Sequence, residues 1–408
     1  MIDLEVPRKF RPLVERARAV AEEVFRPISR TYDLAEHEYP RELDLLSAVI
    51  DGMSSSGASQ GAGASSSVAA VGSGEAHEAA PTVRNGSNMS SVLSILETCR
   101  GDVGLTLSIP RQGLGNAAIA AVANDEQKAR YAGRWAAMAI TEPETGSDSG
   151  AIRTTAVRDG DEYVLNGEKI YVTSGERAEL VVVWATLDRS LRKQAIKSFV
   201  VSRSNPGLRL VRLEHKLGIR SSDTAAFHLD DCRVPAQDLL GDPEIRIAGG
   251  FGGAMQTFDN TRPLVAAMAL GLTRACLDTT TALLADAGVH VDWDRPANVQ
   301  HAAAARLIRM EAEYESAHAL TLRAAWMADN GRPNSMEASM AKAKAGRTCV
   351  DVSLACVELA GATGYAEREL LEKWARDSKI LDIFEGTQQI QLLVVARRLL
   401  GMSSSQLK

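Results

Sequence analysis

The sequence predicts an α+β protein, mostly α-helical, with a helical N-terminal domain, a middle β-domain and a helical C-terminal bundle. Three observations predict this order. Apolar residues recur at helical spacing in the first third of the chain. Strand-like runs replace that pattern in the middle, and residues that favour helices return afterwards. We therefore predict domains at 1–136, 137–245 and 246–408.

The N-terminal domain is expected to contain several helices around one irregular segment. Residues 10–26 carry the apolar stripe of an amphipathic helix, and a second helix is expected from near Pro40. From Ser54 to Gly74, 18 of 21 residues are Ser, Gly or Ala. So little apolar surface does not offset the entropy of ordering, which predicts a flexible loop at about 52–80. Helical patterning resumes at 91–97 and again at 115–131.

The middle domain is expected to be a small, mostly antiparallel sheet. Residues 163–173 predict a hairpin whose turn is Asn166-Gly167, a pair that favours two-residue turns. Leu180–Ala185 is a continuous apolar run, typical of a buried strand. Further short strands are predicted at 198–201, 208–211 and 226–229. In the C-terminal domain, glycine-containing breaks at 331–334 and 361–364 separate four or five long helices.

Composition and charge exclude several classes of protein. Hydrophobic residues at 45% and charged residues at 24% indicate a folded chain, and a net charge of −6 argues against nucleic-acid binding. The longest apolar stretch, Leu264–Leu272, is far shorter than the ~18 residues of a membrane span. No signal-peptide core is present, and the five cysteines include no Cys-x-x-Cys pair. We therefore expect a cytoplasmic protein with no membrane span.

Motifs narrow the chemistry to two segments. The seven histidines show no metal-ligand spacing, so no metal is expected, and hydrolase and phosphate-loop motifs are absent. Residues 249–253 favour a glycine-rich helix start, because no strand precedes them. The informative segments are 139–148 and 376–391. In the second, Glu385 lies among apolar residues before a glycine, where burial would raise the pKa of a general base. A helix cap or an ion-paired acid fits the same pattern.

After residue 90 the chain closely resembles the acyl-CoA dehydrogenase family, because five motifs occur in the family's order. They are Thr-Glu-Pro-x-x-Gly-Ser-Asp at 141–148, Asn-Gly-x-Lys-x-x-x-Thr-x-Gly at 166–175, Lys-Leu-Gly-Ile-Arg-Ser-Ser-Asp-Thr at 216–224, Phe-Asp-Asn-Thr-Arg-Pro at 258–263 and Phe-Glu-Gly-Thr at 384–387. The resemblance implies an antiparallel β-domain between N-terminal helices and a C-terminal four-helix bundle. It also implies an FAD cofactor between the β-domain and the bundle, at a subunit interface.

The resemblance implies a reaction as well, the α,β-dehydrogenation of an acyl-CoA thioester to a trans-2-enoyl-CoA. Glu385 matches the base that removes the α-proton while the β-hydrogen leaves as hydride to flavin N5. The backbone amide of Glu385 and a flavin hydroxyl would stabilise the thioester oxygen. Some relatives carry the base on a bundle helix, but the matching position here is Thr261, which cannot take up a proton. The expected electron acceptor is an electron-transfer flavoprotein.

The family's contact residues can be carried over by position. Those matched to FAD contacts are Met138, Ile140, Thr141, Gly146, Ser147, Tyr171, Val172, Thr173, Thr387 and Gln389. Those matched to acyl-CoA contacts are Ser147, Phe258, Asp259, Arg262 and Gly386. Thr141 and Thr173 are expected to offer hydrogen bonds to the flavin ring. Tyr171 replaces the family's common tryptophan, although an ordinary strand aromatic is the alternative.

Two departures from the family pattern concern the neighbouring subunit's FAD. The expected Arg-x-x-Phe-Gly segment is replaced by His290–Asp294, and a usual glutamine is replaced by Glu358 before the 361–364 turn. We therefore expect an oligomer, either a homotetramer built as a dimer of dimers or an assembly with a paralogous subunit. A non-catalytic or half-site subunit of a heteromeric enzyme and an acyl-CoA oxidase remain alternatives. Loss of an ordered wall at 52–80 would widen the pocket for a bulky acyl group.

Overall fold

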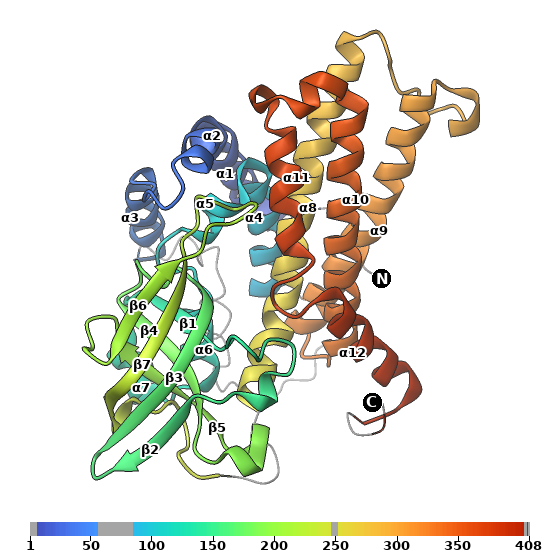
Figure 1. Cartoon of the computed structure of the whole chain (residues 1–408). Coiled ribbons are helices and arrows are strands. Elements are labelled where there is room, and N and C mark those ends of the chain that lie inside the picture. Colours follow the sequence, from blue (N-terminus) through green and yellow to red (C-terminus); the bar gives the residue numbers. More distant parts are fainter. Residues whose placement is uncertain (1–5, 56–84, 246–251, 404–405, 407–408) are drawn as a thin grey trace.

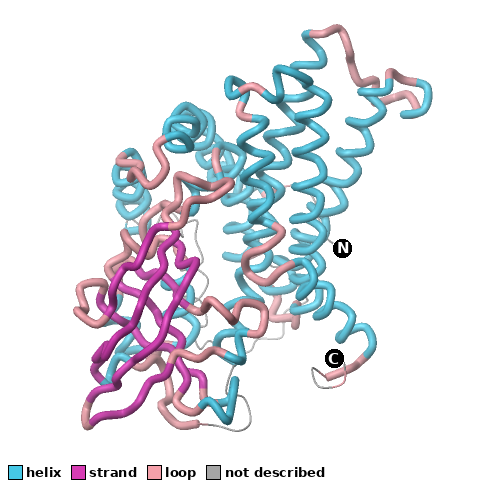
Figure 2. The backbone as a smooth tube through the Cα atoms, viewed as in Figure 1, coloured by secondary structure: helices cyan, strands magenta, loops and turns pink. Residues whose placement is uncertain are grey.

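The computed structural model describes residues 6–55, 85–245, 252–403 and 406. A twisted sheet stands beside the lower half of a long helical bundle, and the first N-terminal helices lie above one end of the sheet, alongside the bundle (Figures 1 and 2). The helices account for most of the described residues. The predicted order of helices, sheet and helices in an α+β fold is therefore confirmed.

The N-terminal helices differ from the predicted ones mainly in where they end. They are α1 (Arg11–Ala19), α2 (Arg26–Leu34), α3 (Glu42–Ser55), α4 (Ser87–Gly101), α5 (Val103–Leu107), α6 (Leu114–Val122) and α7 (Asp125–Tyr131). A π-helical turn, Val20–Phe25, joins α1 to α2 without a break. The predicted helix at 115–131 is two helices, because Asn124 and Gln127 form a capping box that starts α7. Residues 52–55 of the predicted loop extend α3, and residues 56–80 lie outside the described part.

The sheet is mostly antiparallel, as predicted. Its strands are β1 (Ala136–Ala139), β2 (Thr155–Asp159), β3 (Glu162–Thr173), β4 (Leu180–Thr186), β5 (Ile196–Ser202), β6 (Leu208–Leu213) and β7 (Thr224–Pro235). They pair in the order β1-β4-β2-β3-β7-β6, with β5 also on β4, and the β1–β4 pairing is parallel. Every residue of β4 is buried, which confirms the buried strand. Its side chains pack with Phe199 and Phe227 in the core of the sheet.

The predicted turn at Asn166-Gly167 is wrong. β3 is one strand, and the hairpin turn precedes it at Gly160, whose φ of +62° suits a tight turn. Asn166-Gly167 instead lies at a β-bulge, where β3 leaves β2 and continues alongside β7. A Cβ on Gly167 would lie 2.7 Å from Cα of Thr154, so the close approach requires glycine. The same residue types thus serve a bulge rather than a turn.

The C-terminal bundle contains three long helices and two shorter ones. They are α8 (Gly252–Asp286), α9 (Ala302–Asp329), α10 (Ser335–Tyr365), α11 (Leu371–Leu381) and α12 (Gln388–Leu400). The break near Gly331 separates α9 from α10, whereas the break at Gly361 is a kink inside α10. Small residues allow close helix packing: a Cβ on Gly271 of α8 would lie 2.2 Å from the Leu96 carbonyl oxygen of α4. Among the described helices, none has the length and apolarity needed to cross a membrane.

A buried ionic cluster ties the three parts together. Lys373 Nζ of α11 lies 2.7 Å from Asp102 Oδ2 of the N-terminal domain and 2.5 Å from Asp377 Oδ2. Asp377 Oδ1 in turn accepts the backbone N–H of Ile219 from the β-domain. Burial alone would lower the pKa of Lys373, but the two carboxylates raise it well above its ordinary value. The cluster fixes α11, and therefore the start of the loop that follows it.

Candidate active site

Glu385 lies in the short connection between α11 and α12 (Figure 1). Glu385 and Gly386 have φ values of +56° and +88°, so the chain turns sharply through two consecutive left-handed residues. For a glutamate this conformation costs about 1–3 kcal/mol and persists only where the surroundings enforce it. Gly386 is required by space as well, because a Cβ there would lie 2.5 Å from Gln391 Nε2.

Hydrogen bonds from two helices enforce this turn. Gln391 Nε2 of α12 donates to the carbonyl oxygens of Glu385 and Gly386, at 3.0 and 3.1 Å. Lys342 Nζ of α10 donates to the same Gly386 carbonyl at 2.8 Å. Thr387 caps α12, since its Oγ1 accepts the N–H of Ile390. The position of Glu385 is therefore fixed from several directions.

The Glu385 carboxylate sits in a setting suited to a base. Its Oε2 accepts a hydrogen bond from Thr261 Oγ1 of α8 at 3.0 Å. Burial raises the pKa of Glu385 above its ordinary value, while the Thr261 hydroxyl and the nearby cations Arg262 and Lys342 partly oppose that rise. Among the described residues it forms no ion pair, and the cap of α12 is Thr387 instead. Neither alternative interpretation of Glu385 from the sequence is thus observed.

The flavin-matched residues of the β-domain come together on two adjacent segments. The Ile170 N–H donates to the Thr141 carbonyl at 2.9 Å, which places the Met138–Thr141 segment beside the end of β3. The side chains that remain partly or largely exposed there are Met138, Ile140, Thr141, Tyr171 and Thr173. Val172 differs, because its side chain is fully buried in the sheet core and only its backbone can face a ligand.

A buried ion pair supports the turn that follows Thr141. Lys169 Nζ lies 2.7 Å from Glu142 Oε1 and also donates to the Ile140 carbonyl. Glu142 accepts further hydrogen bonds from the N–H and hydroxyl of Thr154, at 2.9 and 2.6 Å. Burial lowers the pKa of Lys169 to about 8, and Glu142 opposes that change. The ion pair thus holds this turn in position, and the turn leaves Gly146 and Ser147 exposed.

These residues fit a flavin. An exposed tyrosine ring and two partly exposed apolar side chains, Met138 and Ile140, offer apolar contacts, and the partly exposed Thr141 and Thr173 offer hydroxyls. An isoalloxazine ring has the same combination of apolar faces and a polar edge. At the bundle, the exposed Gln389 and the partly exposed Thr387 are the residues matched to the adenosine half. The hydroxyl oxygen of Thr387 is already engaged in capping α12.

The substrate-matched residues lie on α8 and on the Glu385 turn. Phe258 and Asp259 belong to α8, but their side chains lie outside the described part of the structure. Arg262 is buried next to Thr261, and its Nη1 lies 3.5 Å from Ser339 Oγ of α10. Gly386 completes the group. The structure therefore places Arg262 and Gly386 close to the carboxylate that matches the base.

Sequence reasoning missed two groups at this site. Lys342 is 1% exposed and bonded to Gly386, yet it carries no motif signal in an alanine-rich helix. Gln391 lies just beyond the motif that contains Glu385, and its amide group was not anticipated as a clamp. One pattern in the sequence could have predicted the burial of Lys342. This lysine lies on the same face of α10 as the buried alanines Ala338 and Ala345.

The departures from the family pattern form local contacts within the chain. Glu358 Oε2 lies 2.5 Å from Arg306 Nη2, so the added carboxylate is paired with a cation of α9. His290–Asp294 belong to the connection between α8 and α9, where the Asp292 N–H donates to Gln300 Oε1 at 3.0 Å. Trp293 in that connection is 63% exposed. This connection therefore exposes both an aromatic side chain, Trp293, and a cation, Arg295.

Comparison with known proteins agrees with the fold. The acyl-CoA dehydrogenase middle-domain model matches residues 137–232, and the acyl-CoA dehydrogenase C-terminal-domain model matches residues 248–400. The mouse (Mus musculus) mitochondrial short-chain specific acyl-CoA dehydrogenase is 40% identical over 263 residues, which are 64% of this chain and 62% of that protein. The matched part thus spans less than two thirds of that relative.

Two other similarities cover more of the molecule. A Bacillus subtilis acyl-CoA dehydrogenase is 34% identical over 321 residues, 77% of this chain and 83% of that protein. The solved structure of butyryl-CoA dehydrogenase from Megasphaera elsdenii superposes with a TM-score of 0.81 at 26% identity, covering 98% of this chain and 100% of that one. Together with the family models, these similarities show that the chain belongs to the acyl-CoA dehydrogenase family.

Proposed function

We propose that this chain is an FAD-dependent dehydrogenase that converts an acyl-CoA thioester to its trans-2-enoyl-CoA and passes the electrons to an electron-transfer flavoprotein. The observation that carries the proposal is the state of Glu385. It is a half-buried carboxylate of raised pKa, bonded to a hydroxyl and held in a strained, clamped turn. Such a group is suited to accept a proton from a weak carbon acid.

In the proposed reaction, the α C–H bond breaks and its proton moves to the Glu385 carboxylate. The Thr261 hydroxyl orients that carboxylate, and the nearby cations Arg262 and Lys342 partly oppose the rise in the pKa of Glu385 that burial causes. The Glu385 amide is proposed to donate to the thioester oxygen, where negative charge develops as the proton leaves. When bound, FAD would accept the β-hydrogen with its electron pair, which balances formation of the double bond.

FAD is proposed to lie against the β-domain face and reach the bundle. Its ring would contact Met138, Ile140, Thr141, Tyr171 and Thr173, with the Val172 backbone behind them. Gly146 and Ser147, exposed in the adjoining turn, would contact the cofactor and the thioester. Thr387 and Gln389 would face the adenosine half, and Phe258, Asp259, Arg262 and Gly386 the acyl-CoA. The Tyr171 ring is 62% exposed and is therefore accessible to a ligand on this face.

The acyl group is proposed to be short. Two similar proteins, the mouse short-chain specific acyl-CoA dehydrogenase and the butyryl-CoA dehydrogenase of Megasphaera elsdenii, are named for short acyl chains. The bulkier substrate suggested by the sequence depends on residues 52–80, most of which lie outside the described part. A panel of thioesters with short, branched and steroid acyl groups therefore tests the short and the bulky substrate against each other. The expected role is in fatty-acid β-oxidation, in the cytoplasm.

A second candidate is a half-site subunit in a heteromeric tetramer. It is favoured by the exchange of a family arginine for the His290–Asp294 segment and by the carboxylate of Glu358. In that case this chain would keep its own Glu385 but contribute little to a neighbour's FAD. A homotetramer built as a dimer of dimers is the simpler assembly.

The test is an absorbance spectrum of the purified full chain, alone and co-expressed with a paralogue, before and after anaerobic addition of the thioester panel. One flavin per chain, bleached by a short acyl-CoA, would support a self-sufficient dehydrogenase. A colourless chain that turns yellow only with the paralogue would support the half-site subunit. Rapid turnover with oxygen as the sole acceptor would indicate an oxidase and contradict the proposed acceptor. A flavin that no thioester bleaches would overturn the proposed reaction.

A further inference from the structure

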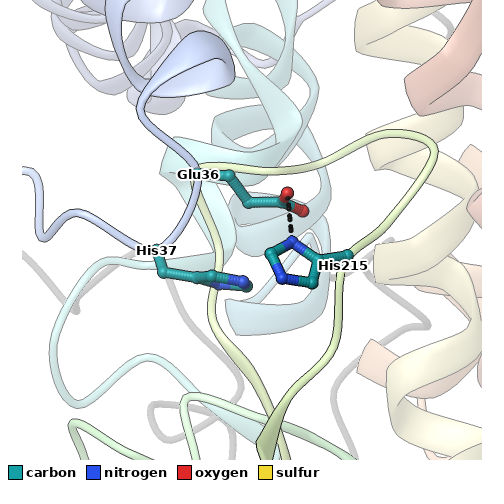
Figure 3. Close-up of side chains that lie close together, drawn as sticks. All are labelled: Glu36, His37 and His215. Atoms are coloured by element: carbon teal, nitrogen blue, oxygen red, sulfur yellow. Dashed lines mark hydrogen bonds and ion pairs between the residues drawn. The ribbon is translucent and has the colours of Figure 1, made fainter.

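Two loops from different domains bring two histidines and a glutamate together (Figure 3). Glu36 and His37 lie in the connection between α2 and α3 of the N-terminal domain. His215 lies between β6 and β7 of the β-domain. The cluster is built from elements other than those that hold Glu385 and the flavin-matched residues, so the proposed dehydrogenase reaction does not use it.

The donor atoms of the three side chains are close to one another. Glu36 Oε2 lies 2.9 Å from His215 Nδ1, and the two imidazole ring centres are 4.9 Å apart. One candidate ligand atom from each residue lies within 4.8 Å of the other two. Glu36 Oε1 also accepts the backbone N–H of Lys216 at 2.8 Å, which fixes the direction of the carboxylate.

Two features of His37 are energetically unfavourable and have no partner in the described part of the chain that explains them. Its φ is +76°, a left-handed conformation that is uncommon for a residue other than glycine. Both of its ring nitrogens are buried and have no hydrogen-bond partner. An unpartnered buried polar group costs about 1–3 kcal/mol, so such a group in a native structure points to an absent partner. Burial also lowers the pKa of His37, which keeps the imidazole neutral and its lone pair available.

We propose that Glu36, His37 and His215 bind a divalent metal ion of the zinc type. Two imidazoles and a carboxylate suit Zn²⁺ rather than Mg²⁺ or Ca²⁺, which prefer oxygen ligands alone. With bonds near 2.0–2.1 Å, two ligands on a tetrahedral ion lie about 3.3 Å apart. The Glu36–His215 spacing is already close to this value. The His215 side chain is 83% exposed, so it has room to rotate as the wider separations close around an ion.

The surrounding charges set the expected strength of this site. Lys216 and Arg220 are cations close to the cluster and oppose a metal ion, while Asp223 favours one. The Lys216 ammonium donates a hydrogen bond to the Ser222 carbonyl at 2.7 Å. We therefore expect weaker binding than in a structural zinc finger.

Bound metal would strengthen a junction that the fold already uses. Next to the cluster, Arg177 of the β-domain donates to the Glu38 carbonyl and lies over the Tyr39 ring. A metal ion held by both loops would add a further link between the same two domains. Binding to the folded chain alone raises its stability by mass action, so the ion is expected to raise the melting temperature.

The test is a titration of the chelator-treated full chain with Zn²⁺ by calorimetry, and with Co²⁺ by absorbance. We expect one ion per chain, intense visible Co²⁺ bands typical of tetrahedral nitrogen and oxygen ligands, and a higher melting temperature. The variants are His37→Asn, which tolerates the left-handed backbone, and His215→Gln, each expected to weaken binding at least about tenfold. The five cysteines are all buried and are poor competitors for added metal.

A matched control is His290→Gln, since His290 is exposed in the connection between α8 and α9 and lies outside the cluster. It should bind Zn²⁺ like the unaltered chain. Circular dichroism of each variant without metal establishes that it folds. Absence of saturable Zn²⁺ binding by the unaltered chain would overturn the proposal, and so would binding that both cluster variants retain in full. Either outcome leaves the proposed dehydrogenase activity untouched.

Discussion

Lys342→Met is expected to impair catalysis without unfolding the protein. Lys342 is 1% exposed, and its ammonium donates to the Gly386 carbonyl beside the proposed base. The variant keeps a long unbranched side chain but removes the charge and the hydrogen bond. It therefore separates the positioning of Glu385 from the packing of α10 against the turn.

The effect on stability comes from two opposing terms. Burial lowers the pKa of Lys342 from 10.5 to about 8, which corresponds to a cost of about 3 kcal/mol for keeping the ammonium charged in the fold. Because the folded pKa is the lower one, this cost is complete below about pH 8 and fades as the pH approaches 10.5. Methionine removes the cost but also removes a hydrogen bond to a charged group, worth about 1.5–3 kcal/mol. At neutral pH the free energy of unfolding should change by less than about 1.5 kcal/mol.

The effect on the reaction should be larger. The variant removes the Lys342 hydrogen bond to the Gly386 carbonyl and so loosens the strained turn that holds Glu385. We therefore expect flavin reduction to slow about 10- to 100-fold. Loss of the cation also raises the pKa of Glu385, so the acidic limb of the pH–rate profile moves to higher pH. Stopped-flow flavin reduction across pH and urea unfolding measure the two effects separately.

Lys344→Met is the matched control, because Lys344 lies two residues further along α10, is more exposed and pairs with Glu313. Its reduction rate and pH profile should equal those of the unaltered chain. A Lys342→Met enzyme with an unaltered rate and an unaltered acidic limb would refute the positioning role. A fall of several kcal/mol in the free energy of unfolding would show that the lost hydrogen bond is not offset by removal of the buried charge.

Three further outcomes are expected. Lys373→Met leaves the buried carboxylates of Asp102 and Asp377 without a cation. The free energy of unfolding, measured by urea denaturation, should fall by about 3–5 kcal/mol. An unchanged denaturation midpoint would contradict this. Gly386→Ala adds a Cβ against Gln391 at a residue whose φ is +88°. This variant should lower the free energy of unfolding by about 1–3 kcal/mol and slow flavin reduction. A variant with full activity and full stability would contradict the strained turn. Because burial raises the pKa of Glu385 and a base must be ionised, kcat should rise with pH through that raised pKa; a rate independent of pH above about 4.5 would argue against it.

The order of domains could be predicted because helix and strand periodicity are local properties of the sequence. Asn166-Gly167 shows where local reasoning fails: the pair fits a hairpin turn, and only pairing with the distant β7 makes it a bulge. Lys342 and Lys344 likewise look alike in sequence. One points into the bundle and the other is more exposed, which depends on how α10 packs.

In the candidate site, too, single residues could be predicted from the sequence but the contacts between them could not. Glu385 could be singled out from its apolar surroundings and from the family motif, and Thr261 from its position in a second motif. Their hydrogen bond joins residues 124 positions apart and required the fold. The Glu36–His215 contact joins residues 179 positions apart, so no ligand spacing could reveal the cluster. Long-range contacts of this kind are decided by packing rather than by local pattern.

The most direct test of the central claim is anaerobic flavin reduction by a short acyl-CoA in Glu385→Gln. Glutamine keeps the size and the hydrogen bond to Thr261 but cannot take up the α-proton. We expect normal FAD content and normal thioester binding, with the reduction rate lowered at least about 100-fold. A variant that reduces its flavin within about twofold of the unaltered rate would show that Glu385 is not the base.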